Sequence, residues 1–195
     1  MRKRYANLKE LLENELRKDH RDTDRGTREA IDLVRQLKHV RKKGYFTRPE
    51  FLKMCRWKSW RTIHLYSANT SRQIEGVARA VLATTDERRR MELLDSLKGV
   101  GIPTASAILM LIDPKRYGVI DIRVWRLLYR YGEVSVNPKG RNFTLDNWDS
   151  CLSKLRYFAK MFNTCPRRIE LALFMCHRRS HLPLAARPRA GTENL

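Results

Sequence analysis

The chain has 195 residues, which is enough for one compact domain, or for one domain with a small flanking helical layer. A hydrophobic content of 42% is typical of a globular protein and argues against a disordered one. The formal net charge of +20 is far larger than solubility requires, so it favours a polyanionic partner, with nucleic acid first and an anionic membrane surface second.

Several classes of protein do not fit the sequence. No apolar run is long enough for a membrane helix, and the basic start of the chain lacks an apolar signal region, so we expect a cytoplasmic protein without membrane contact. The cysteines form no CxxC pair, which argues against a disulfide scaffold or an iron–sulfur cluster. One further candidate zinc ligand set lacks the spacing of a paired zinc knuckle, which argues against a zinc site. The cysteines are Cys55, Cys151, Cys165 and Cys176, and the rejected zinc set is Cys165, Cys176, His177 and His181.

In chain order, helical periodicity predicts two N-terminal helices, separated by a polar break at 19–26. Three capping boxes, each a Thr followed three residues later by Glu or Gln, then predict helix starts. They begin at Thr47, Thr70 and Thr84 and divide residues 47–97 into four short helices. The apolar stripes of the two N-terminal helices are Leu8, Leu11, Leu12 and Leu16, and Ile31, Val34 and Leu37.

The second half of the chain is also predicted to be helical. An apolar helix over 105–112 is followed by Asp113 and Pro114, where proline cannot continue it. A helix over 122–131 precedes a loop at 132–143. An amphipathic helix follows at 148–162, and Pro166 opens the last helix. Because no segment alternates as a strand does, the predicted fold class is all-α. We expect an N-terminal helical segment at 1–44, a core at 45–180 with a hairpin at about 87–112, and a flexible basic tail at 181–195.

Residues 97–105 predict a tight turn between two helices. Gly99 and Gly101 flank Val100, and such a turn brings backbone N–H groups close to a ligand. Pro103 suits a first helical turn, and a helix N-terminus attracts anions. With Lys98 in the turn, the segment predicts a site for a DNA phosphate.

Two segments in register carry a family resemblance. The string Leu-x-Gly-Val-Gly-x-x-Thr-Ala at 97–105 and the segment Val-Ile-Asp-Ile-Arg-Val-Trp-Arg at 119–126 resemble the helix-hairpin-helix base-excision DNA glycosylases of the endonuclease III type (the HhH-GPD superfamily). The resemblance is good over 97–128 and follows helix order over about 47–178. It implies a multi-helix HhH-GPD fold, phosphate contacts and a catalytic aspartate at Asp121. The implied contacts are Lys98, Gly99, Val100, Gly101, Thr104 and Arg123.

Asp121 suits the chemistry that the resemblance implies. A carboxylate stabilises the oxocarbenium-like charge that develops on the sugar and activates the attacking water. The alternative interpretation is that Asp121 only caps the helix that follows it. Pro103 stands 18 residues before Asp121, where strand-cleaving members of the family carry a Schiff-base lysine, so the resemblance implies base release without strand cleavage. Lys98 and Lys58 are alternative amines, although nothing in their spacing requires that role.

The segment 55–61 is the candidate for handling an extruded base. Trp57 or Trp60 could stack on a base, while Arg61 could fill the vacated place in the duplex and Lys58 adds a cation. Alternatively, one tryptophan belongs to the core and the cations form a solvated face. Trp125 is likewise either part of the cleft or part of the core.

The sequence therefore predicts a monofunctional DNA glycosylase that leaves an abasic site. It would act as a monomer on double-stranded DNA in the nucleoid, need no cofactor and hold no catalytic metal, and the hairpin leaves room for a monovalent cation. The alternative is a helix-hairpin-helix protein that binds DNA without catalysis. A nuclease lacks the clustered carboxylates that two-metal chemistry needs.

Overall fold

A computed structural model describes residues 5–18 and 24–179. Within these ranges the chain is helical and contains no strand, so the predicted all-α class is confirmed. None of the described helices is both long and apolar enough to cross a bilayer. The predicted tail at 181–195 and His181 lie outside the described residues.

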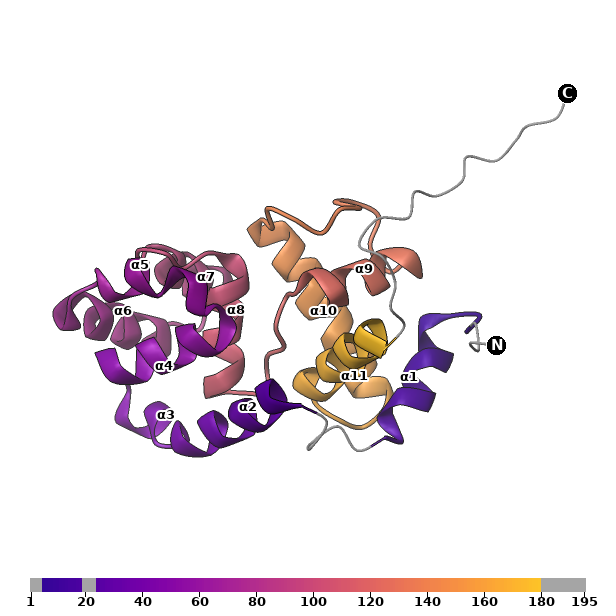
Figure 1. The fold of residues 1–195 in the computed structure, drawn as a ribbon, viewed down its shortest axis with the longest axis horizontal. Helices are drawn as coiled ribbons and strands as arrows, with labels where there is room; N and C mark the ends of the chain where they lie inside the picture. The colour runs from indigo at the N-terminus through magenta and orange to yellow at the C-terminus, as the bar shows by residue number, and fades with distance from the viewer. Residues whose placement is uncertain (1–4, 19–23, 180–195) are drawn as a thin grey trace, which may run out of the picture.

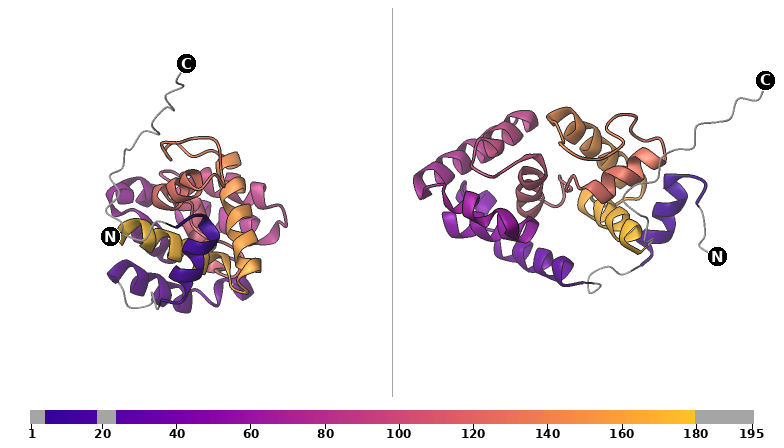
Figure 2. Two further views of the ribbon diagram at one scale, coloured as in Figure 1. Left: turned by 90° about the vertical axis from the view of Figure 1, so that its right-hand side faces the viewer. Right: turned by 45° about the horizontal axis from the view of Figure 1, so that its top comes forward.

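The helices form two groups that lie beside each other (Figure 1). The first group is α2 (Arg25–Gln36), α3 (Val40–Lys43), α4 (Arg48–Lys58), the 3-10 turn η1 (Trp60–Thr62), α5 (Ile63–Ser67), α6 (Ser71–Ala83), α7 (Glu87–Asp95) and α8 (Ile102–Ile112). The second is α1 (Leu8–Leu16), α9 (Ile122–Arg130), α10 (Leu145–Met161) and α11 (Pro166–Arg179). The segment 113–121 runs from α8 in the first group to α9 in the second, as the right-hand view in Figure 2 also shows.

The N-terminal segment is divided between the two groups. Helix α1 packs against α11, whereas α2 packs against α4 and α8. The apolar residues Leu8, Leu11 and Leu12 of α1 are buried in these contacts, and so are Ala30 and Leu37 in and after α2. Residues 5–18 and 24–44 are therefore built into the second and the first helix group, respectively.

Helix α8 is the central element of the first group. Every residue from Ile102 to Ile112 is buried except Pro103, as expected for a helix that is apolar on all sides. It contacts α4 and α7 in its own group and α10 in the other. This burial fixes the position of the hairpin before it and of the segment 113–121 after it.

Local sequence accounts for most helix starts, with one correction. Thr47 and Thr70 form the expected capping boxes with Glu50 and Gln73. The box predicted at Thr84 is wrong, because Thr84 ends α6 and the carboxylate of Asp86 accepts from the N–H of Arg89 to cap α7. An aspartate two residues later is the stronger N-cap here. A further box, Thr144 with Asn147, starts α10.

Candidate active site between the two helix groups

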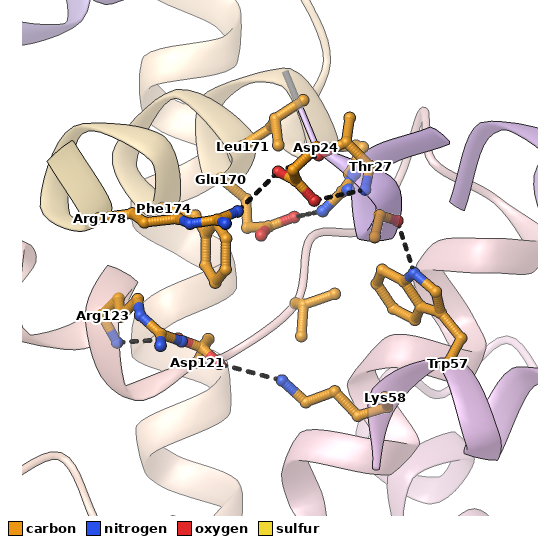
Figure 3. Close-up of a pocket in the computed structure, with 13 residues that line it drawn as sticks. Asp24, Thr27, Trp57, Lys58, Asp121, Arg123, Glu170, Leu171, Phe174 and Arg178 are labelled. Carbon is orange, nitrogen blue, oxygen red and sulfur yellow. Dashed lines mark hydrogen bonds and ion pairs between the residues drawn. The ribbon is translucent and has the colours of Figure 1, made fainter. Parts of the chain in front are cut away.

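A cavity of about 220 Å³ lies where the two groups meet (Figure 3). It is larger than the roughly 150 Å³ that suffices to hold a benzene ring. The first group contributes the start of α2 and the end of α4, and the second contributes α9 and α11, with the segment 113–121 between them. The side chains that line it include Asp24, Trp57, Lys58, Asp121, Arg167, Glu170 and Phe174.

Asp121 is held at the edge of this cavity by its position as the N-cap of α9. Its Oδ1 accepts a hydrogen bond from the backbone N–H of Arg123 at 2.9 Å, and its Oδ2 accepts from the Nζ of Lys58 at 3.2 Å. The guanidinium of Arg123 lies 3.9 Å from Oδ1. Only 16% of the Asp121 side chain is exposed. Capping and a position in the cavity therefore occur in the same residue.

Burial and charge act on Asp121 in opposite directions. Burial alone would raise the pKa of the Asp121 carboxyl, but the charge of Lys58 and the two hydrogen bonds outweigh it, with a smaller contribution from Arg123. The net result is a pKa below its usual value of 3.8. Asp121 is therefore a carboxylate at neutral pH, as electrostatic stabilisation of a cationic sugar requires.

Lys58 reaches Asp121 from the other helix group. It is the last residue of α4, its side chain is 16% exposed, and it lies 63 positions before Asp121 in the chain. In the sequence, Lys58 is recognisable only as part of a cationic segment that contains tryptophan. Its contact with Asp121 could not be predicted, because no local pattern links residues that are 63 positions apart.

Two aromatic rings line the cavity from opposite groups, as Figure 3 shows. The indole of Trp57 donates from Nε1 to the carbonyl of Gly26 at 2.8 Å, which fixes the ring against α2. Phe174 belongs to α11, and the guanidinium of Arg123 lies 5.1 Å from its ring centre. Flat apolar surfaces of this kind suit a planar ligand.

Glu170 is a further carboxyl in the cavity, in addition to Asp121 and Asp24, and the sequence interpretation missed it. Its side chain is 4% exposed and pairs with Arg167, one helical turn earlier on α11. Burial raises the pKa of Glu170 despite the opposing charge of Arg167. The apolar positions Ile169, Ala172 and Leu173 mark α11 as a core helix, and that pattern hides the polar residue between them.

The hairpin has the geometry that a phosphate site requires. Gly99 has a φ of +83° and Gly101 has a φ of −110°. Buried Asn69 holds the turn, since its Oδ1 accepts from the N–H of Lys98 at 2.9 Å and its Nδ2 donates to the carbonyl of Lys98 at 3.0 Å. The N–H groups of Gly101 and Ile102 make no hydrogen bond to any described residue. These donors lie at the N-terminus of α8, where an anion is stabilised.

The residues predicted to contact phosphate divide into two sets. Lys98 and Gly99 are exposed and Gly101 is partly exposed. Val100 and Thr104 are buried, and the Thr104 hydroxyl lies 3.3 Å from that of Tyr66. The side chains of Val100 and Thr104 thus support the hairpin from within. Arg123 lines the cavity, away from the hairpin sequence.

The remaining base-handling candidates also separate. Trp60 is 68% exposed in η1, next to the exposed Arg61. Trp125 is fully buried and donates to the carbonyl of Asn137 at 2.8 Å, so its place is in the core and outside the cavity lining. Among the described residues, no group of His, Cys, Asp and Glu has the arrangement of a metal site.

Comparison of the chain with protein-family models, with curated proteins and with solved structures finds no match in any of the three.

Proposed function

We propose that this protein is a DNA glycosylase that excises a modified base by using the carboxylate of Asp121. The proposal is carried by the cavity, in which a buried, ionised carboxylate lies with Trp57 and Phe174 on the same chain as the exposed hairpin. The family resemblance of residues 97–128 gives the reaction class. The net charge of +20 supports DNA as the partner.

The proposed reaction uses Asp121 as the electrostatic and basic group. As the bond between C1′ and the base nitrogen breaks, positive charge develops on the sugar, and a carboxylate beside it lowers the barrier. The same carboxylate orients the attacking water and accepts its proton. The products are a free base and an abasic site.

Base extrusion would use the two tryptophans in different ways. Trp57 and Phe174 provide the walls for an extruded base, while the exposed Trp60 and Arg61 follow directly after α4 and can enter the duplex. The hairpin would hold the backbone through Lys98 and the N–H groups at the start of α8, with a monovalent cation as a further possible ligand of the turn. We propose a monomer acting on double-stranded DNA.

The test is base release by Asp121→Asn. Duplexes that each carry one modified base are incubated with the protein and then treated with alkali to reveal abasic sites. We expect the substitution to slow base release by about 100- to 10,000-fold, because it removes the general base and the charge that faces the sugar. Asp146→Asn, on the exposed side of α10, is the matched control and should act as the wild type does.

One observation favours a second function. Both oxygens of Asp121 already have partners within the protein, an arrangement that also suits a purely structural cap. In that case the protein would bind DNA through the hairpin without chemistry. Wild-type protein that binds duplex DNA but releases no base from the panel would establish this alternative and refute the glycosylase.

A further inference from the structure

The cavity holds a primary amine that the glycosylase reaction by water attack does not need. Lys58 is the only lysine among the described residues that line it. Its Nζ lies 3.2 Å from the Oδ2 of Asp121, so an atom that reaches this carboxylate also comes within reach of the amine. Pro103, on the first turn of α8, has no amine to offer.

Contacts of the residues on either side of Lys58 fix its backbone at the end of α4, and Asp121 pairs with its amine. Ser59, directly after it, donates its N–H to the carbonyl of Cys55 at 2.8 Å and so completes the last turn of α4. Trp57, directly before it, is fixed to Gly26 of α2. Asp121 then holds the amine itself. A nucleophile with few accessible orientations loses less entropy in reaching its target.

We infer that Lys58 is a nucleophile that forms a Schiff base with C1′ of an abasic site and so gives this protein strand-cleaving activity. The inference rests on the proposed function for the way DNA is held. It goes beyond that function, because Pro103, considered by itself, implies that the protein releases a base without cutting the strand.

Each step of this reaction balances. Lys58 first gives up one proton, and its neutral amine nitrogen then bonds to the aldehyde carbon C1′. The carbonyl oxygen leaves as water with that proton and a second one from the nitrogen, which gives a protonated imine. Asp121, the carboxylate nearest to that nitrogen, takes a proton from C2′. The electron pair forms a double bond between C2′ and C3′, and the C3′–O bond breaks with its electrons on the departing 5′-phosphate. Addition of water to the imine then releases Lys58 and an unsaturated aldehyde.

The experiment uses the full chain and a duplex with a single abasic site, so it does not depend on knowing the excised base. Sodium borohydride reduces an imine to a stable amine, which links the protein covalently to the DNA. We expect the wild type to cut the abasic strand without alkali and to form this adduct. Trypsin should then place the adduct on the peptide Trp57-Lys58-Ser59-Trp60-Arg61.

Two variants test the assignment. Lys58→Arg keeps a cation beside Asp121 but offers no amine, so both the adduct and strand cutting should fall to background while the melting temperature is retained. Lys53→Arg makes the same exchange at an exposed position on α4 and should form the adduct as the wild type does. A wild type without an adduct, an adduct on another peptide, or an adduct that persists in Lys58→Arg would each overturn the inference.

The result is separable from that of the proposed function. Base release in the modified-base panel without an adduct would leave the glycosylase in place and remove the role of Lys58. An adduct at Lys58 without any base release would support the role of Lys58 and remove the proposed glycosylase activity. It would identify an enzyme that acts on existing abasic sites.

Discussion

Two of the three carboxyl groups that line the cavity, Asp121 and Glu170, have their pKa values displaced in opposite directions. The charge of Lys58 and the hydrogen bonds lower the pKa of Asp121, whereas burial raises that of Glu170. Such a pair keeps one carboxylate ionised beside a neighbour that binds its proton more tightly. Asp121 is thus the carboxylate available for the charged role.

Glu170 should make the stability of the protein fall as the pH rises. Because its pKa is raised in the folded state, its contribution is fully present below the unfolded value of about 4.5 and is lost as the pH rises through the folded value. Glu170→Gln should remove this slope, so that wild type loses stability relative to the variant from pH 4.5 upward. Urea unfolding at a series of pH values measures the difference, and a difference that grows in favour of wild type with rising pH would contradict this assignment.

The two glycines of the hairpin have different structural roles. Gly99 has a positive φ, and a Cβ added there would lie 2.7 Å from the Cβ of Leu65. A Cβ added at Gly101 would meet no atom within 4 Å. The first glycine is required by the fold, and the second leaves open the space through which a phosphate would approach.

Alanine at each position should therefore have a different effect. Gly99→Ala should lower the free energy of unfolding by about 1–3 kcal/mol, because it combines backbone strain with the contact to Leu65. Gly101→Ala should leave stability nearly unchanged but weaken binding to a short duplex, because its methyl group stands in front of the free N–H groups. Urea unfolding and fluorescence anisotropy measure the two effects. Equal losses of stability would refute the distinction.

The elements themselves could largely be predicted from the sequence, since each depends on local signals. The caps at Thr47 and Thr70, the proline at the start of α11 and the glycine turn all act within a few residues of where they occur. The prediction at Thr84 failed because two adjacent caps competed and the local pattern did not rank them. Asp121 was singled out because its segment and the hairpin together resemble a glycosylase family, and whether it is catalytic stays a prediction.

The other half of the candidate site could not be predicted in this way. Lys58 approaches Asp121 from a different helix group, and Asn69 holds the hairpin from 29 residues away. Glu170 lies within a helix whose apolar pattern indicates only burial. These contacts are set by how helices pack, and no short segment of sequence contains that information.

The net charge of the whole molecule, +20, should supply most of its affinity for DNA. The logarithm of the binding constant should fall linearly with the logarithm of salt concentration, by about 0.9 per phosphate neutralised. Lys98→Gln should reduce the magnitude of that slope by about one, because it removes one phosphate contact. Lys154→Gln, whose amine pairs with Glu133 on the protein, is the control that should leave the slope unchanged. Titrations at several salt concentrations test this, and an unchanged slope for Lys98→Gln would exclude the hairpin lysine from the interface.

Ion pairs join the two helix groups both at the cavity and away from it. Glu87 of α7 accepts from Arg156 of α10 at 2.7 Å and from Arg116 of the crossing segment at 2.8 Å. At the cavity, Asp24 at the start of α2 pairs with Arg178 of α11 at 3.0 Å. The pair between Lys58 and Asp121 also joins the two groups at the cavity, so the cavity can widen there only if both pairs separate.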